Sequence, residues 1–378
     1  MGTAKISMSI NWNCVRPMVL GLFCIVAAGC DPAVNVPADA RPDAGSSVTE
    51  SGPNPEPATW SEIVGVVDLR KFPVMVKAVY VQQNAAGSHF TLPMGDVAQA
   101  IDFHKAKLAE FGWKPESDPK LWQVLPQGAQ LFFNKNGQRL YASIGVSGDG
   151  NLNAGLFHLA NIDARRFPRT AVAELVEELP SRVIYRTLAD GEKIRKFMSE
   201  ELAKQGWQEF RRPPIKGLPP GMGGTNNEAR FLKGAVGVDV MTYPIDGKTQ
   251  VMTGVRVLPN PLPVMTEARA VEYEEDPVQL TYATPADVGA VLAFFRTEMP
   301  KLGWKEDEAA SKKDAERREA AKKAKVEKPK DPKAGDLDDA EVVTLRFDAP
   351  DRRPLRFEVL HSGEVSFVRF TPWPEEKK

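Results

Sequence analysis

The side chains that could do chemistry in this sequence are histidines, serines and acidic residues, and their spacing is the first test of catalysis or metal binding. Four histidines are scattered along 378 residues, with no His-x-x-x-His motif and no Glu pairing that would hold a metal. They are His89, His104, His158 and His361. Ser147 lies in GVSGDG, which lacks the Gly-x-Ser-x-Gly spacing of a nucleophile elbow. Because no set of residues converges as a catalytic site requires, the sequence predicts no catalytic residue, no metal site and no cofactor.

Three polar residues have the alternate spacing with which a calcium-binding loop begins. They are Asp149, Asn151 and Asn153. However, Ala154 stands where such a loop needs glycine, and Ala160 stands where a bidentate glutamate should be. The pattern therefore favours a hairpin turn over a calcium site.

The remaining polar patterns have structural interpretations. The stretch GLPPGMGG (217–224) has no Gly-Lys-Ser/Thr ending and no strand leads into it, which favours a flexible insert over a phosphate cradle. Two acidic groups lie on expected strands and are interpreted as solvent-facing or edge-protecting residues. These are Glu174, Glu177 and Glu178, and Glu272, Glu274 and Glu275.

The N-terminus has the pattern of an export signal. Residues 1–17 carry Lys5 and Arg16 and no acidic residue, and residues 18–28 are an uninterrupted apolar run of eleven. This run is too short to span a bilayer, which needs about 20 residues, and it suits a signal peptide over 1–29. Met8 is an alternative start that would leave a shorter basic region.

The apolar run ends in Ala27-Ala28-Gly29-Cys30, which resembles the lipobox of bacterial lipoproteins, although Ala27 stands where that family more often has leucine. The resemblance implies cleavage before Cys30, a diacylglyceryl group on its sulfur and usually an acyl chain on its new amine. Two acyl chains anchor a protein stably where one would be marginal. The alternative is a plain secretory signal in which Cys30 is incidental.

The same resemblance sets the expected location. The chain is expected in the cell envelope, attached to the membrane through its N-terminal lipid, on the periplasmic side or at the outer membrane. Asp31 resembles the inner-membrane retention signal of enterobacterial lipoproteins, and the choice between the two membranes stays open. Residues 31–59 are rich in Pro, Ala, Ser and Asp and cannot bury enough to fold, so 30–59 is expected to be a disordered tether.

Charge and cysteine usage limit the possible partners. Lys+Arg 49 and Asp+Glu 50 give a formal net charge of −1, so there is no general basic field for nucleic acid, which is not expected as a partner. All three cysteines lie in the first thirty residues, so the rest of the chain has no thiol for a disulfide, a zinc site or catalysis. The folded part must be held together by packing alone.

The elements that would position any site come in three copies. Trp113, Trp207 and Trp304 each follow a glycine at the end of an expected helix, and they are 207−113 = 94 and 304−207 = 97 residues apart. A phenylalanine and a Leu or Met recur in step before each tryptophan. The recurring core residues are Trp113, Trp207, Trp304, Phe103, Phe197, Phe294, Leu108, Leu202 and Met299. The period suits one small domain per copy better than a solenoid of short repeats.

A second repeated motif supports this duplication. DLRKFP at 68–73 matches DARRFP at 163–168, a separation of 163−68 = 95 residues. Such Gly-Trp-closed modules resemble uncharacterised repeats of bacterial envelope proteins, in which a helix with Phe, Leu and Gly-Trp is followed by strands. The resemblance covers about residues 60 to 373 and carries no known activity.

The expected fold is α+β, with three tandem small domains. Each is an antiparallel sheet with one helix packed on it, in the order strand-strand-helix-strand-strand-strand. The expected boundaries are 60–162 for module 1, 163–260 for module 2 and 261–378 for module 3. In module 3 the densely charged stretch 305–338 is expected to be a disordered insertion, with a transient helix up to Val326 as the alternative.

Each helix is expected to bury one side against its sheet. In modules 1 and 3 that side comprises Val97, Ala100, His104, Leu108 and Phe111, and Val288, Val291, Phe295, Met299 and Leu302. The phenylalanine ten residues before each tryptophan is expected at the helix flank under a neighbouring loop, or alternatively in contact with the next module. Because the tryptophans close the core, they are interpreted as structural and not as a sugar-stacking platform.

The expected helix ends rest on single residues. Thr187 and Thr284 are the expected N-caps of the second and third helices, with Pro285 at the first helical position. Pro300 counts against a regular last turn in the third helix, because it lacks a backbone donor.

Two functions are compatible with these features. The first is a lipid-anchored, non-catalytic envelope protein whose modules bind another envelope protein or a cell-wall polymer. The second is an envelope hydrolase or small-ligand-binding protein with a site between modules. A cleft with converging carboxylates or histidines would favour the second hypothesis, and shallow, separate surfaces would favour the first.

Overall fold

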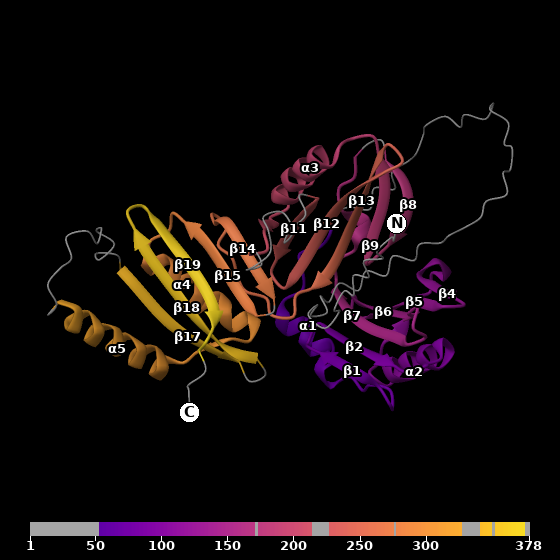
Figure 1. Ribbon diagram of the computed structural model, residues 1–378, viewed down its shortest axis with the longest axis horizontal. Helices are drawn as coiled ribbons and strands as arrows, with labels where there is room; N and C mark the ends of the chain where they lie inside the picture. Colours follow the sequence, from indigo (N-terminus) through magenta and orange to yellow (C-terminus); the bar gives the residue numbers. More distant parts are fainter. Residues whose placement is uncertain are drawn as a thin grey trace, which may run out of the picture. The chain divides into compact units, whose positions relative to one another are not determined.

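The computed structural model describes residues 53–170, 173–213, 227–275, 277–326, 341–349 and 352–374 (Figure 1). These residues form an α+β structure with three antiparallel sheets, each made from its own stretch of sequence, which confirms the predicted α+β class and the three separate sheets. The expected signal peptide, Cys30, most of the tether and the stretch GLPPGMGG lie outside the described residues.

The first sheet is built from module 1. Helix α1 (Trp60–Val66) and the short 3-10 helix η2 (Leu69–Lys71) precede it. Its elements are β1 (Val79–Gln83), β2 (Gly87–Leu92), α2 (Val97–Glu110), β3 (Lys114–Pro115), η3 (Pro119–Leu121), β4 (Trp122–Leu125), β5 (Gly128–Lys135), β6 (Gln138–Val146) and β7 (Leu152–Ala160). The strand order is β1-β2-β7-β6-β5-β3, and β4 pairs with β5.

Modules 2 and 3 repeat this arrangement. Module 2 contains η4 (Ala164–Arg166), β8 (Glu174–Leu179), β9 (Arg182–Thr187), α3 (Gly191–Lys204), β10 (Gln208–Phe210), β11 (Glu228–Lys233), β12 (Val236–Ile245) and β13 (Lys248–Val257). Module 3 contains β14 (Arg269–Glu275), β15 (Val278–Thr284), α4 (Val288–Glu298), η5 (Met299–Leu302), β16 (Lys305–Glu306), α5 (Glu308–Val326), β17 (Glu341–Ala349), β18 (Arg352–Ser362) and β19 (Val365–Pro372). The strand orders are β10-β11-β12-β13-β9-β8 and β14-β15-β19-β18-β17-β16.

The three sheets place equivalent strands at equivalent positions. The first strand of each module (β1, β8 or β14) is an edge strand, and the short strand after the helix (β3, β10 or β16) is the opposite edge. Each helix packs on a central strand of its own sheet, α2 on β6, α3 on β12 and α4 on β18. The short strands are additional to the predicted order. They span only two or three residues and so show no alternating pattern in the sequence.

The Gly-Trp pairs end the helices through one repeated hydrogen bond. Gly112, Gly206 and Gly303 have φ angles of 77°, 80° and 80°, which a glycine adopts without steric cost. This turn lets the tryptophan N–H donate back to the helix, to the carbonyl oxygens of Leu108, Leu202 and Met299 at 2.9, 3.0 and 3.1 Å. The recurrence of Gly-Trp after Leu or Met is therefore a repeated helix-ending motif.

The starts of α3 and α4 differ from those predicted. The N-caps are Asp96, Asp190 and Asp287, whose side chains accept backbone N–H groups of the first turn. Thr187 instead ends β9, and its hydroxyl accepts the N–H of Ala189 at 3.3 Å. Thr187 and Thr284 are therefore turn residues, because the strands extend to them and the helices begin only after the aspartates. The prediction for Pro300 is confirmed, since α4 gives way at Met299 to the 3-10 helix η5.

The buried helix sides follow the predicted stripes with one exception. All five predicted residues of the module 3 stripe are buried. In module 1 the prediction for Phe111 was wrong, because this side chain is 38% exposed. Phe111 is the C-cap residue, where the helical path ends, so its ring covers the edge of the core, 5.9 Å from the ring of Phe72.

The charged stretch 305–338 contains ordered structure where disorder was expected. Helix α5 occupies 308–326, while 327–340 lie outside the described residues. Two contacts account for its start. The Asp307 carboxylate accepts the N–H of Ala310 at 2.9 Å, and the buried Ser311 hydroxyl accepts the N–H of Arg346 on β17 at 3.0 Å.

Candidate functional site

The recurring aromatic residues lie in the cores. Trp113, Trp207 and Trp304 are 2%, 5% and 0% exposed, and Leu108, Leu202 and Met299 are fully buried. Phe103, Phe197 and Phe294 are half-buried and pack on the rims of the hydrophobic clusters. The Phe103 ring contacts Phe72 and Phe90 of its own module, both at 6.3 Å, as the flank interpretation expects. In these positions the residues support packing of the cores.

Two histidines are buried as neutral rings. His104 donates from Nδ1 to the Ala100 carbonyl at 2.7 Å and is stacked between Phe72 and Phe90. His158 accepts the Ala160 N–H at Nδ1, 3.0 Å away. Burial lowers the pKa of both rings, that of His158 to about 3. Protonation of either would place a charge in the module 1 core, so neither ring is suited to exchange protons near neutral pH.

His361 and Ser366 form a Ser-His pair that is not poised for nucleophilic attack. His361 Nδ1 lies 2.9 Å from the Ser366 hydroxyl, but that hydroxyl donates its proton to the Ala286 carbonyl at 2.6 Å. The histidine must therefore donate to the serine, whereas a general base would accept from it. Ser366 is also completely buried.

The calcium-loop candidate is a turn between β6 and β7. Asp149 accepts hydrogen bonds from the Ser147 hydroxyl at 2.6 Å and from the Asn151 side chain at 2.7 Å. The hydrogen bond from Ser147 is the main reason that the pKa of Asp149 is lowered. Within the described residues, no three His, Cys, Asp or Glu side chains are arranged to hold a metal ion.

The two acidic groups have different surroundings. On β8, Glu174 is exposed and pairs with Lys248, and Glu177 pairs with Arg182. On β14 the prediction of a solvent face was wrong for Glu275, which is half-buried and pairs with Arg256. The reason is that module 2 covers this part of β14, which the local sequence pattern does not show.

Modules 2 and 3 are joined by backbone hydrogen bonds between strands. The Arg211 N–H donates to the Val271 carbonyl, and the Tyr273 N–H donates to the Arg211 carbonyl, both at 2.8 Å. Arg211 thus pairs in parallel with Glu272, at the outer edge of β14. The rings of Phe210 and Tyr273 meet edge to face at 5.5 Å, so side chains cover the paired backbone.

A half-buried ion network lies beside this junction. Asp239 accepts from Arg256 Nε at 2.9 Å and lies 3.6 Å from Arg230 Nε. Arg256 also pairs with Glu275, and so links the two modules. Burial alone would raise the pKa of Asp239, but the charges of Arg256 and Arg230 outweigh it, and the pKa is lowered. The network therefore holds its charged form near neutral pH.

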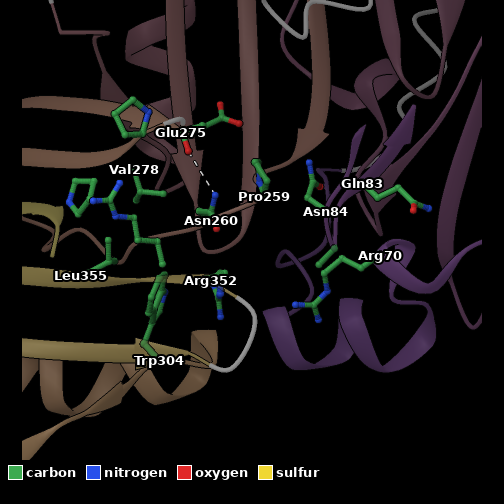
Figure 2. A pocket seen from close by; sticks show the side chains of 14 residues that line it. Arg70, Gln83, Asn84, Pro259, Asn260, Glu275, Val278, Trp304, Arg352 and Leu355 are labelled. Atoms are coloured by element: carbon green, nitrogen blue, oxygen red, sulfur yellow. Dashed lines mark hydrogen bonds between the residues drawn. The ribbon is translucent and has the colours of Figure 1, made fainter. Parts of the chain in front are cut away.

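A hollow of about 300 Å³ is lined by residues of module 1, the last residues of module 2 and residues of module 3. Figure 2 shows Arg70 and Asn84 on one side of it and Trp304 and Leu355 on the other. Arg70, Arg352, Arg353 and Glu275 are the charged side chains among its described lining residues. Guanidinium and amide groups donate hydrogen bonds, so the hollow could hold a small ligand rich in acceptors.

Arg352 is held against two tryptophans in this hollow. Its guanidinium carbon lies 4.2 Å from the Trp304 ring centroid and 5.3 Å from that of Trp60 on α1, and Nη2 donates to the Leu302 carbonyl at 2.7 Å. Burial lowers the pKa of Arg352 to about 10, and the charge of Arg70 adds to this effect. Arg352 therefore joins the first helix to the end of η5.

Exposed apolar side chains gather on the first strand of module 1, β1, and in the turn before it. Val76, Val79, Tyr80 and Val81 are 87%, 38%, 82% and 42% exposed, within six consecutive residues. Tyr80 has a φ of 50°, which is rare for a bulky side chain. Among the described residues, only β2 pairs with this strand.

Sequence reasoning did not single out Arg211, Arg352 or Tyr80. The first two make contacts with residues far away in the chain, which no local pattern reveals. Tyr80 lies 270−80 = 190 residues before Ala270, which also has a positive φ, of 52°, but this likeness is visible only in the structure because the two residue types differ.

Comparison with known proteins adds no family. No protein-family model, curated protein or solved structure matches this chain. None of the helices in the described part is long and apolar enough to cross a membrane.

Proposed function

We propose that this chain is a lipid-anchored, non-catalytic envelope protein whose three modules form a binding or adaptor array. The anchor is Cys30, in the lipobox-like sequence Ala27-Ala28-Gly29-Cys30, and 30–59 is the tether. The modules span 60–162, 163–260 and 261–378 and are copies of one domain. The partner is an envelope protein or a cell-wall polymer, reached from the periplasmic side or at the outer membrane.

The observation that carries this proposal is the strand contact at β14. The edge of one module receives a strand from another through two backbone hydrogen bonds and an aromatic contact. This is the way in which many binding modules hold extended peptides. Since each module has an equivalent first strand at a sheet edge, the fold offers the same kind of contact more than once.

Anchoring is tested by lipid labelling. Labelled palmitate should mark the wild-type protein in cells, and Cys30→Ser should abolish the label and release the chain from the membrane fraction. Cys14→Ser is the matched control and should keep the label. Recovery of an unmodified protein from the cytosol would contradict the proposal.

A small-ligand-binding protein is the second candidate, and the hollow beside Arg352 favours it. The exposed side chain of Arg353 lines this hollow and can be removed without opening a core. Citrate, as a carboxylate-rich probe, should raise the thermal unfolding midpoint of the wild type but not that of Arg353→Ala. An equal shift in both proteins, or none in the wild type, would count against this candidate.

A further inference from the structure

The outer edge of β14 shows how this module type receives a strand. Glu272 and Glu274 pair with Thr281 and Gln279 of β15. The intervening residue Tyr273, and Val271 before it, direct backbone groups to the other side, where they bond to Arg211. The acceptor is therefore the Val271 carbonyl and the donor is the Tyr273 N–H.

A bulge comes directly before this receiving site, and module 1 has the same bulge. In β14 the pairing passes from Arg269↔Ala283 to Glu272↔Thr281, so β14 has one residue more than its partner strand. In β1 it passes from Val79↔Thr91 to Gln82↔His89, again with one extra residue. The residue within each bulge, Ala270 or Tyr80, is left-handed.

The shared bulge fixes which groups of β1 face outward. Counting 190 residues back from β14, Val81 corresponds to Val271, and Gln83 corresponds to Tyr273. Gln82 pairs with His89, and the Asn84 N–H donates to the Gly87 carbonyl at 2.8 Å, so both face β2. The Val81 carbonyl and the Gln83 N–H then face away from β2, as their counterparts in β14 do.

The side chains along this edge select the kind of strand that fits. Val79 to Gln83 carry no charge, and Gln82 replaces the Glu272 that lies opposite Arg211. Val79, Tyr80 and Val81 present apolar surface to solvent. A charged strand would find no opposite charge along this edge. An apolar, uncharged strand would remove apolar surface from water both on itself and on β1.

The first strand of module 2 is a poorer match. Its bulge falls between Leu175 and Glu177 and contains no residue of positive φ. Glu178, at the position of Tyr273, is already paired with Arg169. The edge of β8 is therefore protected by charge, while that of β1 is apolar.

We propose that the outer edge of β1, from Val79 to Gln83, binds an extended, uncharged and largely apolar segment of a partner protein by strand addition. This rests on the proposed function as a binding array and gives that function a partner class and a site. The Val81 carbonyl and the Gln83 N–H make the backbone contacts, and Tyr80, exposed at the bulge, covers the incoming strand.

The first test measures peptide binding to the full-length chain in detergent. The probe is a fluorescent, end-capped peptide of residues 207–213 with Glu209→Gln, Arg211→Val and Arg212→Thr, which removes its charges. The wild type should bind it saturably, and more tightly than the unsubstituted peptide. Val81→Lys should weaken binding by at least about tenfold, which corresponds to about 1.4 kcal/mol.

Matched variants keep this test decisive. Val124→Lys changes an exposed apolar side chain on a different strand, β4, where Val124 is 53% exposed, and it should leave binding unchanged. Tyr80→Lys is a second edge variant, and circular dichroism checks that each variant is folded. Absence of saturable binding, or equal loss in the Val124 variant, would overturn the proposal.

The second test identifies the occupant in cells. Tyr80 is replaced by p-benzoylphenylalanine and crosslinked by light, with and without Val81→Lys. A crosslink to an uncharged, apolar stretch of another protein, lost with Val81→Lys, supports the proposal. A crosslink only to a second copy, only to residues 31–52 of the same chain, or to nothing overturns it. If the wild-type protein carries no palmitate label but still binds the peptide, the anchoring proposal fails and the strand-binding proposal stands.

Discussion

The backbones of Tyr80 and Ala270 adopt the same left-handed conformation, with φ of 50° and 52°, at equivalent points of two modules. This conformation costs a bulky residue about 1–2 kcal/mol, and it costs asparagine less. Because Tyr80 is 82% exposed, little packing would be lost on its removal. We expect Tyr80→Asn to raise the free energy of unfolding by about 0.5–1 kcal/mol in urea titrations. Val79→Asn, in extended backbone, should not raise the free energy of unfolding. If both substitutions lower it, the backbone of Tyr80 is not strained.

Trp207 closes the core of module 2. It is 5% exposed, its ring meets Phe167 edge to face at 5.7 Å, and its N–H ends α3. Truncation to alanine removes that volume, so Trp207→Ala should cost about 3–5 kcal/mol and unfold module 2. Calorimetry and protease sensitivity at 163–260 would measure this. A well-folded variant that has lost only ligand binding would show that the ring serves a site instead.

Arg256 holds two carboxylates at the junction of modules 2 and 3. Arg256→Met keeps most of the apolar stem but removes the hydrogen-bonded partner of Asp239, which keeps only the charges of Arg230 and Arg212 nearby, and it leaves Glu275 without this partner. Because Asp239 and Arg256 are half-buried and solvent screens them in part, the loss should be about 1–3 kcal/mol. Chemical denaturation measures the loss, and adding Asp239→Asn should recover part of it. If the double variant is no more stable than the single one, the carboxylate does not cause the loss.

His158 should make module 1 sensitive to acid. Its folded pKa of about 3 is below the unfolded value of about 6.5, so between these pH values the unfolded chain binds a proton that the folded chain does not. Stability present above about pH 6.5 should fall by up to about 1.4 kcal/mol per pH unit on acidification. His158→Asn keeps an acceptor for the Ala160 N–H and should flatten this dependence. If stability falls as steeply with acid in His158→Asn as in the wild type, His158 is not the cause of the dependence.

The repeat was readable from the sequence because its causes are local. Gly-Trp after Leu or Met is fixed by a single helix-ending turn, so Gly112, Gly206 and Gly303 mark the three modules directly. The helix starts were displaced, since a Thr-x-x-Asp pattern does not show how far the preceding strand extends. The strand contact of Arg211 with β14 could not be predicted. The paired residues are about sixty positions apart in the sequence, and backbone pairing requires no particular side chain on either strand.

The contacts that Trp60 makes with Gly303 and Arg352 have a consequence for protein synthesis. A Cβ on Gly303 would lie 3.7 Å from the Trp60 ring, and Arg352 follows Trp60 by 352−60 = 292 residues. A chain emerging N-terminus first cannot complete this contact until its last sheet has been made. Until then the Trp60 ring lacks its contact with Arg352, and a product that ends before Arg352 never gains it.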